Sequence, residues 1–211
     1  MRETRVILLG GTSHTGKSTL ARTMADRLGF THRSTDGLAR HPGRPWSTPG
    51  REVPAHVADH YARLSVDELV ASVLDHYERL WPTVAELVAA RARGNGTGTG
   101  LVLEGSAVLP ARVAELAVPR TAAVWLTADD TVLRSRIHAE SRYEDATSER
   151  QRLVDAFLAR AARYQRHVVD SLDRLGLDRI DTGHARPVTE LADRVLATVG
   201  GTEHGGTPTG R

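Results

Sequence analysis

Ten residues near the start of the chain, Gly10-Gly-Thr-Ser-His-Thr-Gly-Lys-Ser-Thr19, determine the class of fold. They follow the apolar run Arg5-Val-Ile-Leu-Leu9, which is typical of a buried parallel strand. Residues 11–18 match the pattern G-x-x-x-x-G-K-[ST] in full, and a helical pattern continues over residues 17–28. Strand, glycine-rich loop and helix in this order predict a phosphate-binding loop.

The positions of this loop have separate chemical roles. Glycines let the backbone turn so that N–H groups face a phosphate, and the helix start adds its positive end. Lys17, the single lysine of the chain, is expected to reach the β- and γ-phosphates of ATP, and the Ser18 hydroxyl to bind Mg²⁺. The predicted ATP-binding residues of the loop are Gly11, Thr12, Ser13, His14, Thr15, Gly16, Lys17, Ser18 and Thr19.

Apolar runs and helical patterns alternate along the rest of the chain. Further strands are expected at 30–34, 101–103, 122–126 and 177–181, and further helices at 66–93, 110–117, 129–140, 149–175 and 187–199. Pro82 is expected to kink or divide the helix 66–93. This alternation predicts an α/β fold, a P-loop NTPase sandwich whose five-stranded, mostly parallel sheet is flanked by helices and carries a small lid.

The length of 211 residues suits one domain. We expect a kinase-type domain over 1–199 and a disordered, Gly/Thr-rich tail over 200–211. Residues 37–54 contain four prolines and three glycines and are interpreted as a substrate loop. Residues 136–149 are interpreted as the lid.

Composition excludes several classes of function. The chain has no cysteine, which excludes disulfides, thiolate metal sites and cysteine nucleophiles. No apolar run approaches the roughly 18–20 residues that span a bilayer, and the N-terminus does not have the pattern of a signal peptide. The net charge of +2 gives no support for a nucleic-acid partner. These features predict a cytoplasmic protein that contacts no membrane.

Two acids follow predicted strands. Asp36 comes after the second strand, where it would stand at the carboxyl edge of the sheet and could accept the proton of an acceptor hydroxyl. Glu104 directly follows the third strand and could hold a Mg²⁺-bound water or contact the substrate. The alternatives are a turn or helix-cap role for Asp36 and a loop-tying role for Glu104.

Arginines supply candidate cations for the transferring phosphoryl group. Arg134, Arg136 and Arg142 lie in or after the helix that follows the fourth strand, and a segment there could close over ATP. In the substrate loop, Arg40 and Arg44 could hold an anion while Trp46 stacks on a ring. The histidines show no metal-ligand spacing, so Mg²⁺ brought by ATP is the only metal expected.

Three motifs together resemble the 2-phosphoglycerate kinase-like group of small P-loop kinases. They are Gly-Gly-Thr-Ser-x-x-Gly-Lys-Ser-Thr (10–19), Ser-Thr-Asp (34–36) and Leu-Glu-Gly-Ser-x-x-x-Pro (103–110). More broadly, the arrangement is similar to that of adenylate kinase, shikimate kinase, chloramphenicol phosphotransferase and polynucleotide kinase/zeta-toxin relatives. The resemblance runs from about residue 5 to residue 199.

This resemblance implies roles for individual residues. The loop lysine and hydroxyl handle phosphates and Mg²⁺, which carries onto Lys17 and Ser18, and the acid that orients the acceptor corresponds to Asp36. Lid arginines correspond to Arg136 and Arg142. The loop after the last strand, residues 182–188 with Arg186, would hold the adenine. One departure is Glu140, which stands where a second lid arginine is often found.

The sequence therefore predicts an ATP- and Mg²⁺-dependent kinase that phosphorylates a hydroxyl of a small molecule, either a metabolite, a nucleoside or an antibiotic. A nucleoside monophosphate kinase is the main enzymatic alternative. A nucleotide-dependent ATPase switch and a nucleic-acid 5′-kinase are further alternatives. The sequence does not distinguish the acceptors.

Overall fold

A five-stranded parallel sheet forms the centre of the computed structural model, which describes residues 4–39, 42–48, 50, 52–94, 99–183 and 186–201. The strands are β1 (Val6–Gly10), β2 (Thr31–Ser34), β3 (Leu101–Glu104), β4 (Thr121–Thr127) and β5 (Arg179–Asp181), in the order β2-β3-β1-β4-β5. Every paired neighbour is parallel. The prediction of a five-stranded α/β sandwich is confirmed, with all strands parallel rather than most of them.

Seven helices surround the sheet in the described part of the chain. They are α1 (Lys17–Leu28), α2 (Ala55–Arg63), α3 (Val66–Arg93), α4 (Pro110–Ala114), α5 (Asp130–Ser141), α6 (Ser148–Leu175) and α7 (Val188–Gly201). None of the described helices is long and apolar enough to cross a membrane. Two short 3-10 turns, η1 (Thr35–Gly37) and η2 (Tyr143–Asp145), follow β2 and α5.

Two helices differ from the sequence-based expectation. α2 was not predicted, because only Val57 and Tyr61 of its nine residues are buried, which is too weak a pattern to recognise. Pro82 lies inside α3, and the helix continues through it instead of dividing. The buried neighbours Leu80 and Val84 hold both sides of the proline against the core, which compensates for the hydrogen bond that proline cannot donate.

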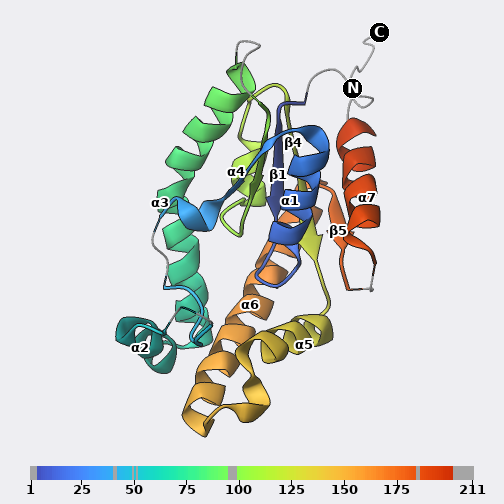
Figure 1. Cartoon of the computed structure of the whole chain (residues 1–211). Coiled ribbons are helices and arrows are strands. Elements are labelled where there is room, and N and C mark those ends of the chain that lie inside the picture. The colour runs from blue at the N-terminus through green and yellow to red at the C-terminus, as the bar shows by residue number, and fades with distance from the viewer. Residues whose placement is uncertain are drawn as a thin grey trace.

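The sheet separates two apolar layers (Figure 1). On one face, Ile7 and Leu9 of β1 pack with α1 and α7. On the other face, Val6 and Leu8 pack with α3 and α6. This alternation follows from the pleat of a strand, which points successive side chains to opposite faces, and burial of both faces explains why β1 reads as an unbroken apolar run.

A third apolar cluster lies beyond the carboxyl ends of the strands, where α2, α5 and the first half of α6 gather (Figure 1). Its centre contains Phe157 of α6, Tyr61 of α2 and Ile137 of α5. Trp46, from the segment between β2 and α2, belongs to the same cluster. The phosphate-binding loop, residues 11–18, therefore lies between the edge of the sheet and this third cluster.

Candidate active site

The phosphate-binding loop has the backbone that its glycines allow. Gly11 has a φ of 124°, and a Cβ there would lie 2.2 Å from the carbonyl oxygen of Leu126 on β4. Gly16 has a φ of 87° and caps α1 without any side-chain hydrogen bond, and the first turn of α1 contains no acid. The N–H groups at this helix start are therefore left for an anionic ligand.

Lys17 is buried at the bottom of the loop, with 7% of its surface exposed. Its Nζ donates to the carbonyl oxygen of Thr12 at 2.5 Å. Burial lowers the pKa of Lys17 to about 8, the nearby Arg44 acts in the same direction, and the carboxylates of Glu104 and Asp36 oppose them. A phosphate in the loop would restore the ordinary basicity of this ammonium, because an adjacent anion favours the charged form.

Ser18 and Glu104 form the oxygen-rich side of the loop. The Ser18 hydroxyl donates to Oε1 of Glu104 at 3.0 Å, and Glu104 is 3% exposed at the end of β3. His32 of β2 brings its Nε2 to 3.9 Å from the same carboxylate oxygen. A hydroxyl and a carboxylate are hard oxygen donors of the kind that Mg²⁺ prefers, so this pair would fit a Mg²⁺ ion.

Asp36 stands where two cavities meet. The phosphate cavity, about 320 Å³, is lined by Lys17, Ser18 and Glu104 among others, and Asp36 lies on its wall. The adjoining space has a volume of about 810 Å³ and is lined by residues 36–39, 42–44, 54, 56 and 57. We name it the acceptor cavity, and Asp36 lies on its wall as well. Arg44 also lines both cavities. The parallel register explains the meeting point, because Ser34 pairs with Glu104 and Asp36 follows two residues later.

A third cavity of about 230 Å³ lies on the other side of the loop and shares Gly16 and Thr19 with the phosphate cavity. Leu20, Leu126, Val188 and Leu191 give it apolar walls of the kind that suit a nucleobase. Arg186 also lines it and pairs with Glu190 at 2.5 Å. This apolar cavity and the phosphate cavity therefore share part of the wall that the loop and the start of α1 form.

The contacts of Arg136 differ from those expected from the sequence. Its Nη1 donates to the carbonyl oxygen of His14 at 2.9 Å, and its Nη2 to that of Thr182 at 2.8 Å. The Thr182 hydroxyl donates to the carbonyl oxygen of Thr15 at 3.0 Å. The sequence predicted a lid arginine that acts on the transferring phosphoryl group, whereas here the guanidinium joins the phosphate-binding loop to the segment after β5.

Glu140 lies inside the phosphate cavity, as do its two partners. His14 of the loop donates from Nε2 to Oε2 of Glu140 at 2.9 Å, and Arg44 forms an ion pair with Oε1. Burial lowers the pKa of His14 to about 4, with Arg44 acting in the same direction, so at neutral pH the neutral imidazole is the donor. The residue that departs from the kinase pattern therefore bridges the loop and the predicted substrate segment.

Trp46 and Arg142 line a separate cavity of about 470 Å³ beside Glu140. Trp46 is only 4% exposed, and its ring lies 4.8 Å from Phe157 and 5.9 Å from His14, centroid to centroid. The ring is therefore a core element rather than a free stacking platform. Arg142 ends α5 in a left-handed conformation. Arg40 lies outside the described residues.

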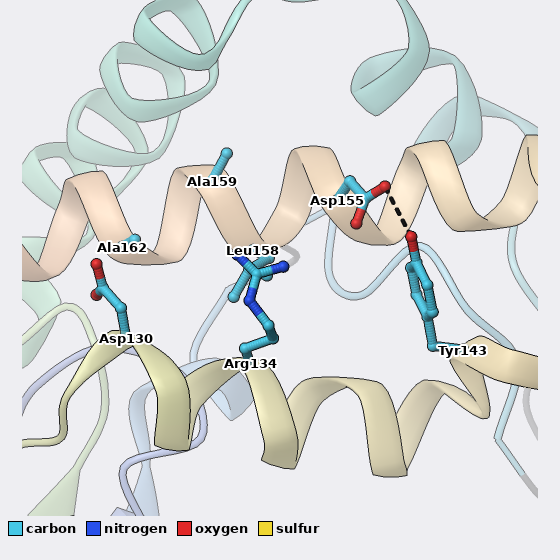
Figure 2. Close-up of a pocket in the computed structure, with 7 residues that line it drawn as sticks. All are labelled: Asp130, Arg134, Tyr143, Asp155, Leu158, Ala159 and Ala162. Carbon is cyan, nitrogen blue, oxygen red and sulfur yellow. Dashed lines mark hydrogen bonds between the residues drawn. The ribbon is translucent and has the colours of Figure 1, made fainter.

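Arg134 lines a different cavity from the phosphate cavity, and Figure 2 shows it with its neighbours there. It faces a cavity of about 420 Å³ between α5 and α6 that also contains the acids Asp130 and Asp155. Because residues two apart on a helix point to nearly opposite sides, Arg134 and Arg136 cannot serve the same site. Arg134 is therefore not brought together with the residues of the phosphate cavity, the two acids disfavour a phosphate beside it, and its contact with ATP stays a prediction.

Sequence reasoning missed some residues of the site. Arg22 of α1 and Ser106, just after β3, line the phosphate cavity. Arg22 follows Ser18 by four positions, which places both on one face of a helix, so helical spacing could have identified it. Ser106 belongs to the third motif, but no role was assigned to it.

No protein-family model matches the sequence, and no curated protein matches it. Among solved structures, a gluconokinase from Sinorhizobium meliloti 1021 is similar with a TM-score of 0.55 and 18% identity, over 95% of this chain and 94% of that chain. A sugar kinase from Janibacter sp. HTCC2649 gives a TM-score of 0.55 and 17% identity, over 92% and 93% of the two chains. A shikimate kinase from Aquifex aeolicus gives a TM-score of 0.50 and 14% identity, over 95% of this chain and 99% of that chain.

These similarities extend along nearly the whole of each chain. At such low identity they establish the fold and not the substrate. The protein has the fold of the P-loop small-molecule kinases, as the three sequence motifs predicted.

Proposed function

We propose that the protein is an ATP-dependent phosphotransferase that moves the γ-phosphoryl group of ATP to a hydroxyl of a small molecule. The observation that carries this proposal is the position of Asp36, a carboxylate on the shared wall of the phosphate cavity and the larger acceptor cavity. In kinases, an acid beside the bound phosphates commonly orients or deprotonates the acceptor hydroxyl.

Each residue of the site then has a defined task. The loop N–H groups and Lys17 would hold the β- and γ-phosphates, and Ser18 with Glu104 would hold Mg²⁺, whose charge would neutralise that of the phosphates. Asp36 accepts the proton of the acceptor hydroxyl while its oxygen forms the new bond to phosphorus. The bond between the γ-phosphorus and the bridging oxygen breaks, and ADP leaves with that oxygen.

Two segments complete the proposal. We assign residues 37–54 to covering the acceptor and residues 136–149 to the lid over the nucleotide. Arg44 of the first segment and Glu140 of the second are paired across the phosphate cavity, which supports their moving together when substrates bind. Arg142, at the end of α5, keeps the proposed lid role.

A phosphoryl-transfer screen tests this function. Purified protein is incubated with ATP and Mg²⁺ against hydroxy acids, sugars, nucleosides, nucleoside monophosphates and antibiotics, and both ADP release and product mass are read. Lys17→Ala, prepared in parallel, controls for contaminating kinases. A product heavier by one phosphoryl group, absent with the variant, supports the proposal and names the acceptor class.

Two results of the screen would contradict the proposal. Hydrolysis of ATP that no small acceptor changes, but that a protein partner stimulates, would identify an ATPase switch. A phosphorylated nucleoside monophosphate would identify the enzymatic alternative, in which the acceptor atom is a phosphate oxygen rather than a hydroxyl.

A further inference from the structure

The arginines that line the phosphate cavity are not those that the sequence predicted for the transferring phosphoryl group. Arg136 donates to backbone carbonyls, and Arg134 and Arg142 line other cavities. Arg22 and Arg44 line the phosphate cavity. Enzymes that transfer phosphoryl groups commonly place a cation on the transferring oxygens. These two arginines are therefore the candidates for that cation.

Arg44 has the better position of the two. Of this pair, it alone lines the acceptor cavity as well, and Asp36 lies on the same shared wall. Burial is the main cause of the lowered pKa of Lys17, and the charge of Arg44 adds to it, which indicates that the two cations lie near each other. A phosphoryl group that passes from the loop toward Asp36 would therefore meet Arg44.

Glu140 holds the guanidinium of Arg44 in the free protein. Oε1 of Glu140 forms the ion pair with Arg44, and Oε2 accepts a hydrogen bond from His14 Nε2 at 2.9 Å. The His14 side chain is 5% exposed, and its ring centroid lies 5.9 Å from those of both Trp46 and Phe157. Glu140 is thus tied to a buried residue of the loop, whereas Arg44, with 43% of its side chain exposed, is the freer partner.

The backbone on both sides of Arg44 is anchored. The carbonyl oxygen of Gly43 accepts a hydrogen bond from the Tyr61 hydroxyl at 2.9 Å, and Trp46 is 4% exposed in the third apolar cluster. Exposed side chains change rotamer rapidly, and an exposed ion pair contributes little free energy. The guanidinium can therefore change partner by rotation of its side chain while the backbone stays in place.

The position of Glu140 in the sequence supports the same arrangement. It stands where a second lid arginine is often found in the kinases that the chain resembles, so the lid side carries an acid. Its partner Arg44 comes from the opposite, acceptor side of the phosphate cavity. The usual order of charges is thus reversed, with the arginine on the segment that would cover the acceptor.

We propose that Arg44 is the catalytic cation for the transferring phosphoryl group, and that Glu140 keeps it from that group until an acceptor binds. The inference rests on the proposed function and adds to it a catalytic residue and the residue that controls it. Once released, Arg44 donates N–H groups to the γ-phosphoryl oxygens, where negative charge develops, and no covalent bond to Arg44 forms or breaks.

The acceptor triggers this exchange by excluding water. A γ-phosphoryl group carries more negative charge than one carboxylate, but in an open, hydrated cavity that difference is strongly weakened. An acceptor that fills the acceptor cavity displaces water from Arg44, so the more highly charged partner is favoured. Attack by water is slow in the absence of an acceptor, because the catalytic cation is then held by Glu140.

Hydrolysis of ATP without an acceptor gives the first test. In this reaction the oxygen of water forms the bond to the γ-phosphorus, its proton goes to Asp36, and ADP leaves with the bridging oxygen. At saturating ATP, Glu140→Gln should hydrolyse ATP about tenfold faster than the wild type, and adding Arg44→Met should remove the increase. Glu86→Gln, at an exposed acid of α3, should hydrolyse ATP at the wild-type rate. Unchanged hydrolysis in Glu140→Gln, or an increase that persists in the double variant, would overturn the inference.

Transfer to an acceptor gives the second test. Arg44→Met should lower kcat by about a hundredfold with the KM for ATP within about threefold of the wild type, and Arg44→Lys should keep part of the rate because it keeps the charge. Arg79→Met, at an exposed arginine of α3 that pairs with Asp75, is the control. Melting temperatures should stay within about 2 °C, since the ion pair of Arg44 is exposed. A loss of kcat in Arg22→Met that exceeds the loss in Arg44→Met would assign the cation to Arg22 instead.

The two tests separate this inference from the function on which it rests. Transfer to a small acceptor at a rate that Arg44→Met leaves unchanged would keep the kinase and remove the role of Arg44. Hydrolysis that Glu140→Gln raises through Arg44, without transfer to any small acceptor, would keep the catalytic role of Arg44. It would remove both the kinase and the acceptor as the trigger.

Discussion

The nucleotide side and the acceptor side of the site are held together by different kinds of contact. On the nucleotide side, Lys17 and Arg136 bond to backbone carbonyls of the loop and of the segment after β5. On the acceptor side, the main link is the ion pair of Arg44 and Glu140, whose side chains are 43% and 32% exposed. Exposed ion pairs contribute little free energy and rearrange easily. We therefore expect the nucleotide side to be formed before a substrate binds, and the acceptor side to rearrange on binding.

The largest effect on phosphoryl transfer is expected from a substitution on the nucleotide side. Lys17→Ala should reduce phosphoryl transfer by about a thousandfold, because it removes the buried cation at the transferring phosphate. Its melting temperature should not fall, since the lowered pKa of Lys17 shows that burial of this charge is unfavourable. The rate of phosphoryl transfer and the melting temperature of the variant are measured and compared with those of the wild type. Normal transfer, or an unfolded variant, would contradict the role given to Lys17.

The next effect tests the boundary between the two sides. Asp36→Asn should lower kcat by about a hundredfold through loss of the proton acceptor, with ATP affinity nearly unchanged. Steady-state kinetics and calorimetric ATP titration separate the two quantities. Asp26→Asn, an exposed acid on α1, is the matched control. A collapse of ATP affinity in Asp36→Asn would assign this residue to the nucleotide side.

A pH titration probes the nucleotide side without a mutation. Free Lys17 has a pKa of about 8 and loses its proton as the pH rises, whereas bound phosphates keep it charged. ATP affinity should therefore be level below pH 8 and about tenfold weaker at pH 9 than at pH 7. Calorimetric titration across this range measures it. A level profile up to pH 9 would mean that the loop holds ATP without the lysine charge.

The smallest effect is expected on the acceptor side, and it is an increase in ATP affinity. Glu140→Gln should strengthen ATP binding about fivefold, because it removes a carboxylate from the phosphate cavity and releases Arg44 for the phosphates. Glu86→Gln, at an exposed acid of α3 outside the proposed lid, should leave ATP affinity as it is. Weaker binding in Glu140→Gln would show that the pair with Arg44 organises the site instead of competing with ATP.

The contrast between the two sides also explains what the sequence could predict. The loop, its strand and its helix are contiguous, so spacing alone specifies their geometry. Asp36 and Glu104 were found because the carboxyl ends of parallel strands meet at one edge, a rule that needs only the strand positions. The fold, and the gathering of these residues around one cavity, could therefore be predicted from local patterns.

The acceptor side depends on contacts between residues far apart in the chain. Glu140 meets His14 and Arg44 across 126 and 96 positions. Arg44 is one of several arginines in residues 37–54, and no local signal shows that it faces the phosphate cavity. Whether Arg134 or Arg136 contacts the phosphate-binding loop depends on the rotation of α5 about its axis. Such contacts are fixed by tertiary packing, which a single sequence does not specify.

The solitary lysine has a consequence for chemical modification. Amine-reactive reagents attack the unprotonated amine, and with a pKa of about 8 a substantial fraction of Lys17 is unprotonated at mildly alkaline pH. Every other side-chain cation of the chain is an arginine or a histidine, so the α-amino group is the sole competing primary amine. A small acylating reagent would therefore mark Lys17 and the N-terminus alone. The share of label that ATP prevents would count the functional sites in a preparation.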